Sequence, residues 1–177
     1  MNTKTLPAAV LPPVSKGPSW LPHPGTYTAT GDRVIVELTS WFGPLVTLSR
    51  RLTAEEAALV VALSADDCVL SLRLTGDVLG GEELSFVSTA IQPEPATAVG
   101  TRLRVPGQLS TGDASVPSVP ATLALRVVER ADDRLLVLGT TRVPYGPLRR
   151  TTGFTLSRIR PADRLRLLVA AEFTCPA

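Results

Sequence analysis

Apolar and polar residues alternate along most of the chain that follows the proline-rich N-terminus. In the first such segment, Val34, Val36 and Leu38 fall on one side of the chain, while Ile35 and Glu37 fall on the other. Because successive side chains of a β-strand point to opposite faces of a sheet, this pattern predicts strands that bury one face. The alternation recurs at residues 69–74, 84–89, 102–109, 121–128, 135–139, 154–158 and 164–173, and we expect further strands at 26–28 and 45–50.

Turn-forming residues separate these segments, for example at 112–113, 131–133, 145–147 and 161–163. Many short strands at roughly ten-residue spacing are typical of a β-sandwich or a β-barrel. Closing the sheet removes its exposed edges, which favours the barrel. We therefore expect an all-β, antiparallel barrel of about eight strands, whose interior holds side chains or one small ligand.

Residues 53–63 fit two kinds of secondary structure. Thr53-Ala54-Glu55-Glu56 has the form of a helix capping box, and helix-forming alanines follow it. The apolar run Leu59–Leu63 would serve equally well as a buried strand. We expect a short helix or helical turn here that leads into a strand.

Proline dominates residues 1–24, and proline joins a sheet poorly because it fixes φ and lacks a backbone donor. We expect an extended tail at 1–24 and one β-barrel domain at 25–177. Two alternatives stay open for the tail, which is either loosely ordered throughout or anchored on the barrel by Trp20 and Leu21. The prolines also interrupt a secretory apolar run, and no stretch of about 18 apolar residues occurs in the chain, so we expect a cytoplasmic protein without a membrane span.

The composition of the 177-residue chain argues against several functions. Its net charge is only +2 and its arginines are interleaved with acidic residues, so we expect no nucleic-acid partner. The single histidine, His23, lies in the tail, which disfavours histidine-dependent catalysis and a histidine metal site. Cys68 and Cys175 match no metal or redox spacing; Cys68 has the surroundings of a small buried residue, and a disulfide between the two stays open. We expect no enzyme activity, no metal and no cofactor.

An ordered series of short motifs resembles a known family. Phe86-Val87-Ser88-Thr89 has the form F-x-S-T, Val119-Pro120 opens a later strand, and Val143-Pro144-Tyr145-Gly146 ends another. With an opening hairpin near Gly25, this order resembles the YceI-like family of lipocalin-type, isoprenoid-binding proteins over most of residues 25–175. Each motif alone is weak, and the order carries the resemblance. The family's Arg-Asp-x-x-Leu helix, its V-x-G-x-F element and its secretion signal are not recognisable here, so one wall or lid of the pocket is expected to differ.

The resemblance implies a lipocalin-like barrel that carries an apolar isoprenoid- or lipid-like ligand without catalysis. Small inward residues such as Ala121, Gly139 and Ala171 would leave space for it. Paired arginines suit a phosphate or carboxylate head group, and we expect Arg149 and Arg150 to bind it, unless these arginines, like the pair Arg50-Arg51, are merely solvated. The interior residues expected to contact the ligand are Trp41, Phe42, Phe86, Leu103, Val105, Leu123, Leu125, Val137, Phe154 and Leu156.

Two other interpretations stay open. The first is a structural or protein-interaction β-domain with a filled core, no ligand and an exposed apolar patch around Trp20, Trp41 and Phe42. The second is an enzyme that uses carboxylates or arginines in a polar cleft. The sequence also leaves open a homodimer, formed through strand edges or through the tail.

Overall fold

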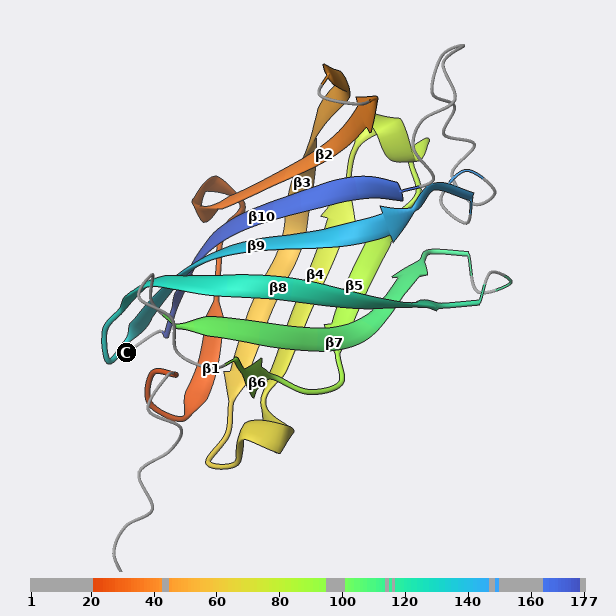
Figure 1. Ribbon diagram of the computed structural model, residues 1–177. Coiled ribbons are helices and arrows are strands. Elements are labelled where there is room, and N and C mark those ends of the chain that lie inside the picture. Colours follow the sequence, from red (N-terminus) through yellow and green to blue (C-terminus); the bar gives the residue numbers. More distant parts are fainter. Residues whose placement is uncertain are drawn as a thin grey trace, which may run out of the picture.

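The structure is a computed structural model that describes residues 21–42, 45–94, 101–113, 115, 117–146, 149 and 164–175. Strands make up most of these residues (Figure 1). They are β1 (Gly25–Thr28), β2 (Val34–Phe42), β3 (Leu45–Val61), β4 (Val69–Thr75), β5 (Leu84–Ser88), β6 (Gln92–Pro93), β7 (Arg102–Thr111), β8 (Val119–Arg130), β9 (Arg134–Pro144) and β10 (Arg164–Thr174). Short 3-10 turns lie at Gly31–Arg33, Ala65–Asp67 and Asp77–Leu79. Within the described ranges, no helix has the length and hydropathy needed to cross a membrane.

The strands form one antiparallel sheet in which neighbours along the chain pair with each other (Figure 1). The sheet closes because β10 pairs with β9 on one side and with β2 on the other. The circuit comprises the eight strands β2–β5 and β7–β10, while β1 pairs with the second half of β3 and β6 pairs with β7. The expected all-β, antiparallel, lipocalin-like barrel is confirmed.

The expected helix within residues 53–63 is wrong, because β3 runs without interruption from Leu45 to Val61. A bulge between Ala54 and Glu56 leaves Glu55 and Glu56 both exposed, and the alternation of buried residues resumes after it. Partners on both sides of β3 supply its backbone hydrogen bonds, which outweighs the weak local preference of Ala and Glu for a helix. Helical residues occur instead directly after β9, at Tyr145, Gly146 and Arg149.

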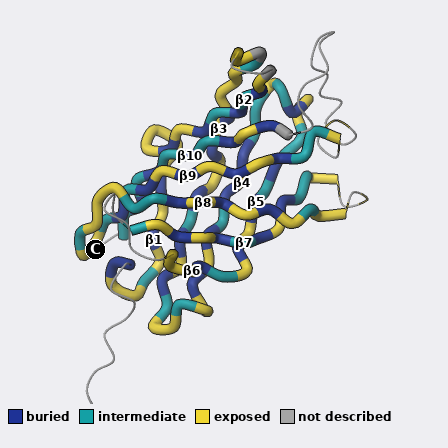
Figure 2. Tube along the Cα trace, in the orientation of Figure 1, coloured by how far each residue is buried: buried dark blue, intermediate teal, exposed yellow. Residues whose placement is uncertain are grey.

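Alternate residues of each strand fill the interior, as the sequence pattern predicts. Figure 2 shows this as alternating buried and exposed stretches along the strands. On β10 the buried residues are Leu165, Leu167, Val169, Ala171 and Phe173. The hydrophobic core therefore lies inside the barrel, and Arg166, between two of these positions, faces outward.

The end of the N-terminal tail is anchored on the barrel. Leu21 is only 4% exposed and belongs to the core, and its carbonyl accepts a hydrogen bond from Arg130 at 3.4 Å. The hydroxyl of Tyr27 lies 2.8 Å from the carbonyl oxygen of His23 and 3.0 Å from that of Asp132. The anchored alternative therefore holds for Leu21, whereas Trp20 lies outside the described residues.

The F-x-S-T motif has a structural role in this barrel. The ring of Phe86 covers the backbone of Gly107, where an added Cβ would meet the Phe86 Cζ at 2.7 Å and the Val87 carbonyl oxygen at 2.4 Å. The Ser88 hydroxyl accepts a hydrogen bond from the Leu70 N–H at 2.8 Å, which extends the ladder between β4 and β5. The motif thus joins β5 to its two neighbours in the barrel wall, β4 and β7.

The expectation that Gly139 leaves free space inside the barrel is wrong. Its register partner Leu125 reaches across it, so that a Cβ at Gly139 would lie 2.4 Å from Leu125 Cδ2 and 3.1 Å from Leu123 Cδ1. The space beside a small residue in a sheet is commonly filled by larger neighbouring side chains, because protein interiors pack densely. Any ligand space must therefore lie elsewhere.

Candidate functional site

Six of the expected ligand contacts lie inside the barrel. Their side chains are buried in the hydrophobic core, where they pack against residues from the facing strands. Contact with a ligand remains a prediction for each of them. These residues are Phe86, Leu103, Val105, Leu123, Leu125 and Val137.

Trp41 does not lie in the interior, contrary to the expectation. Ser40 takes the buried position at the end of β2, and a bulge follows between Ser40 and Trp41. By the alternation of β2, Trp41 follows Ile35 and Glu37 on the outer face, where its side chain is 37% exposed and the guanidinium of Arg166 lies 5.8 Å from the centre of its ring. The Trp41 indole N–H donates to the Thr39 hydroxyl at 3.3 Å, which gives the polar edge of the ring a partner.

Four other expected contacts fall outside what the structure describes. Phe154, Leu156 and Arg150 lie outside the described residues, and so does the side chain of Phe42. Arg149 is described and exposed. Of the second arginine pair, Arg50 stands opposite Leu38 on the inner face of β3, yet its side chain is exposed and donates to the Ser49 carbonyl at 3.1 Å.

The wall of the barrel opens between β8 and β9. The two strands are paired as far as Ala124 and Thr140, and beyond this point no pairing joins them. Residues 119–123 of β8 pair with β7, and residues 141–144 of β9 pair with β10. Figure 1 shows β8 and β9 diverging toward this end. We call this opening, bounded by residues 119–123 and 141–144, the seam.

Two prolines account for the seam. If the register of Ala124 and Thr140 continued, Pro120 would stand opposite Pro144. The N–H of Val127 donates to the Thr101 carbonyl at 3.0 Å, on the β7 side. Because backbone groups of successive residues point alternately to the two neighbouring strands, the backbone of Pro120 faces β9. Proline has no N–H, so a pair of these two residues would form no hydrogen bond, and the ladder ends before them.

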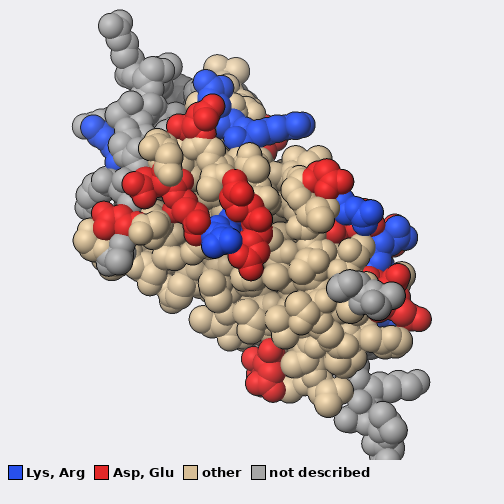
Figure 3. Space-filling model, turned by 180° about the vertical axis from the view of Figure 1, so that it is seen from behind, with Lys and Arg blue, Asp and Glu red and all other residues tan. Residues whose placement is uncertain are grey.

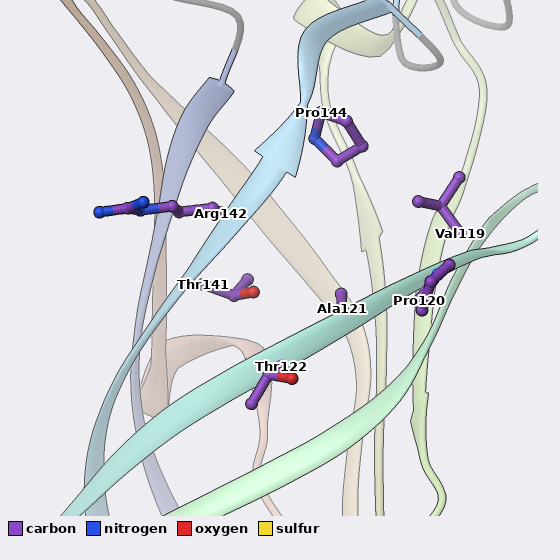
Figure 4. A pocket seen from close by; sticks show the side chains of 7 residues that line it. All are labelled: Val119, Pro120, Ala121, Thr122, Thr141, Arg142 and Pro144. Carbon is purple, nitrogen blue, oxygen red and sulfur yellow. The ribbon is translucent and has the colours of Figure 1, made fainter.

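The seam contains a groove of about 500 Å³. Ala121 and Thr141, which are buried, line it together with residues that face outward, so the groove passes between the inner and outer faces of the wall. Its lining residues are Val119, Pro120, Ala121, Thr122, Thr141, Arg142 and Pro144 (Figure 4). The groove is open on one side and both apolar and polar residues line it, and its volume falls within the range of small-molecule sites.

The polar groups of the groove differ in their surroundings. Thr141 is 5% exposed, and its hydroxyl has no hydrogen-bond partner within the described part of the chain. A buried hydroxyl without a partner costs about 1–3 kcal/mol. Arg142 is exposed, and Figure 4 shows its guanidinium directed away from the opening. The Thr141 hydroxyl oxygen is thus enclosed by the protein, although other parts of the residue line the groove.

A second, shallower hollow lies on the outer face beside the paired part of β8 and β9. Its volume is about 320 Å³, and its lining includes Glu94, Arg102 and Arg126. Arg102 and Arg126 stand opposite each other in the register of β7 and β8. Sequence reasoning predicted neither hollow.

The reverse side of the barrel has a largely uncharged surface (Figure 3). Val60 and Val69 stand opposite each other in the β3–β4 register, and both are exposed, as is Val87 on β5. Arg73 pairs there with Glu56 at 3.0 Å and Glu83 at 3.7 Å. These exposed valines belong to β3, β4 and β5, whereas Trp41, around which an exposed patch was expected, belongs to β2.

Burial sets the properties of the ionisable core groups. Both cysteines are free, and burial raises the pKa of the Cys68 thiol, which keeps it protonated and poorly nucleophilic. Burial likewise raises the pKa of Tyr27. Within the described residues, no three His, Cys, Asp or Glu side chains are grouped closely enough to hold a metal ion.

Two prolines could have indicated the seam in the sequence. Pro120 and Pro144 each interrupt an alternating segment near its end, which is a known sign of an edge or a broken ladder. Their mutual position, however, depends on the register of two strands and so emerges only in the fold. No family model and no curated protein sequence matches the chain, so the site stands on its geometry.

Proposed function

We propose that the protein binds and carries an apolar small molecule of the isoprenoid or lipid type, without catalysis, and that the molecule occupies the seam groove. The observation that carries this proposal is the groove of about 500 Å³ that passes through the barrel wall between β8 and β9. Pockets for small molecules commonly measure about 300–1,000 Å³. The resemblance to the YceI-like family supports the same ligand class.

The lining favours an apolar ligand. Val119, Pro120, Ala121 and Pro144 offer hydrocarbon surface, and each CH₂ group that they bury contributes about 0.8 kcal/mol to binding. Among the described residues of the lining there is no carboxylate, histidine or cysteine, and these are the side chains that most often transfer protons or attack substrates. Such a lining supports binding rather than chemistry.

Native mass spectrometry of the protein purified from its own host, followed by organic extraction, tests this proposal. A retained apolar molecule of defined mass is the expected result. A ligand-free mass that does not shift when prenyl or acyl lipids are added would overturn the proposal and favour a structural or interaction domain.

Two matched variants locate the ligand. Ala121→Phe places a ring in the seam groove, while Ala124→Phe places the same ring in the outer hollow on the same strand. We expect Ala121→Phe to abolish retention of the ligand and Ala124→Phe to leave it unchanged. Circular dichroism and thermal unfolding show whether each variant keeps the barrel.

A further inference from the structure

The hairpin formed by β2 and β3 extends beyond the barrel wall. Within the described residues, β2 pairs with β10 only as far as Thr39, and β3 pairs with β4 only from Thr53 onward. At the turn, the last residues of β2 and the first residues of β3 therefore pair only with each other. Figure 1 shows the two strands reaching past the ends of β4 and β10. We call Trp41, Leu45 and Val46 the hairpin tip.

The hairpin tip exposes large apolar side chains on both faces of the hairpin. Leu45 is 65% exposed and Val46 is 50% exposed, and Trp41 is also exposed. Trp41 and Val46 are register partners and so share one face, while Leu45, the neighbour of Val46, points to the other face. A protein partner with a flat surface would cover one of these faces, whereas a lipid bilayer surrounds an inserted tip on every side. The arrangement therefore favours a lipid surface.

Tryptophan is well suited to such a surface. Its ring is apolar and its N–H is polar, which is why tryptophan is enriched where a bilayer meets water. In Trp41 the N–H is bonded to the Thr39 hydroxyl, on the side of the barrel, so the apolar part of the ring is free to contact lipid.

Arginines lie behind the hairpin tip. Arg50 and Arg51 are exposed on β3, and Arg166 lies beside Trp41. Glu37 stands opposite Arg51, so positive charge exceeds negative charge among these residues. At about 3.3 Å per residue, Arg50 and Arg51 follow Val46 by about 13–17 Å. An apolar segment that lies at a bilayer surface reaches about 5–10 Å into it, so the arginines would lie among the head groups, where they attract anionic phosphate.

We propose that the hairpin tip inserts into the surface of a lipid bilayer that contains anionic lipids, and that Arg50, Arg51 and Arg166 contact the head groups. This proposal goes beyond the proposed function and does not depend on it, because the tip belongs to β2 and β3 and the seam groove to β8 and β9. A carrier bound in this way would exchange an apolar ligand with the bilayer without passing it through water.

Tryptophan fluorescence tests insertion without altering the hairpin tip. The full-length Trp20→Phe protein is mixed with vesicles of phosphatidylcholine and phosphatidylserine in equal parts, with and without bromine atoms on the acyl chains. We expect the brominated lipids to quench Trp41 and its emission to shift to shorter wavelength. Absence of binding to these vesicles, or binding without quenching, would overturn the proposal.

Matched substitutions on the apolar residues locate the contact. The double variant Leu45→Thr, Val46→Thr keeps β-branched residues that suit a strand, and it should weaken sedimentation with the mixed vesicles about tenfold or more. Ile35 and Val87 are each 48% exposed elsewhere on the outer surface, and Ile35→Thr, Val87→Thr should bind as the wild type does. Circular dichroism shows whether each double variant keeps the barrel.

A second pair of variants tests the arginines. Arg50→Gln, Arg51→Gln should weaken binding to the mixed vesicles about tenfold or more and leave binding to phosphatidylcholine alone unchanged. Arg104→Gln removes an exposed arginine on β7 and should have little effect.

The other results contradict the proposal in different ways. Equal weakening by the tip variant and by Ile35→Thr, Val87→Thr would mean that another surface meets the lipid. A dimer that the tip variant dissociates, together with failure to bind vesicles, would mean that a second copy of the chain covers the tip. The proposed function survives either result, because ligand retention in the seam groove is measured separately.

Discussion

Pro120 and Pro144 stand at the same level of the two strands that part, and neither has a backbone N–H to offer the other. Each is well accommodated on its remaining side, where Pro120 pairs with Gln108 and Pro144 with Arg164. Both prolines therefore lack a backbone N–H on the sides of β8 and β9 that face each other, and the wall opens between these two strands. The candidate site is a consequence of this coincidence.

Replacing both prolines should close the seam. In the double variant Pro120→Val, Pro144→Val the two new N–H groups face the opposite strand, and the pair Thr122 and Arg142 can then also join the ladder. We expect hydrogen exchange of the Thr122 and Arg142 amides to slow about tenfold or more, because each added backbone bond contributes about 1 kcal/mol. The binding of apolar ligands should fall in parallel.

Pro106→Val is the control for this experiment. Pro106 lies opposite Thr122 on β7, but its carbonyl accepts from the Thr89 N–H, so its backbone faces away from β8. A new N–H at this position should leave exchange at the seam unchanged. Unprotected seam amides in the double valine variant would contradict the role of the two prolines.

Gly107 should tolerate no side chain. An added Cβ would lie 2.4 Å from the Val87 carbonyl oxygen, a backbone atom that cannot move without breaking the β5–β7 ladder. We expect Gly107→Ala to lower the free energy of unfolding by about 3 kcal/mol, measured by urea denaturation.

Gly139→Ala is the comparison for Gly107→Ala, because its added Cβ is crowded equally closely but by a side chain that can move. The nearest atom to its added Cβ, also at 2.4 Å, is the flexible end of the Leu125 side chain. This variant should lose only about 1 kcal/mol. A loss as large as that of Gly107→Ala would show that the core around Leu125 cannot adjust.

Tyr27 should make the protein sensitive to alkaline pH. Burial raises its pKa above the ordinary value of 10.0, so the folded state holds this proton more tightly than the unfolded chain does. The resulting stability is present in full below pH 10.0 and is lost as the pH rises through the higher pKa of the folded state. Urea denaturation from pH 8 to pH 11 should show a steeper decline of the free energy of unfolding for the wild type than for Tyr27→Phe.

The buried thiol of Cys68 contributes a decline of the same sign, since burial raises its pKa too. Measuring Tyr27→Phe in a Cys68→Ala background separates the two groups. If the pH dependence is unchanged by Tyr27→Phe in that background, Tyr27 is not its cause.

Trp41 should remain accessible whether or not the groove is filled. Its indole lies on the outer surface beside Arg166, on β2 and away from the lining of the seam. In a Trp20→Phe background, acrylamide should quench Trp41 fluorescence strongly, and an added prenyl ligand should leave the quenching unchanged. If the ligand reduced acrylamide quenching of Trp41, this residue would belong to the binding site after all.

The alternation of apolar and polar residues was sufficient to predict the fold class and most of the inward faces. Leu103, Val105, Leu123 and Val137 are buried as the period of two requires. The alternation also places Trp41 on the outer face, with Ile35 and Glu37, and the expectation of an inward Trp41 departed from that pattern. Sequence reasoning also failed at residues 53–63, where a local helix signal competes with strand partners that are distant in the sequence.

By itself, the sequence determined an antiparallel barrel and its core-facing residues, because side-chain period and turn residues are local properties that the chain carries wherever it folds. Only the tertiary structure decided where the barrel opens and which residues line the opening. Pro120, Pro144 and Thr141 lie on two different strands, and their relation depends on the register at which β8 meets β9. Such a register results from the packing of the whole sheet, so no single segment of the sequence contains it.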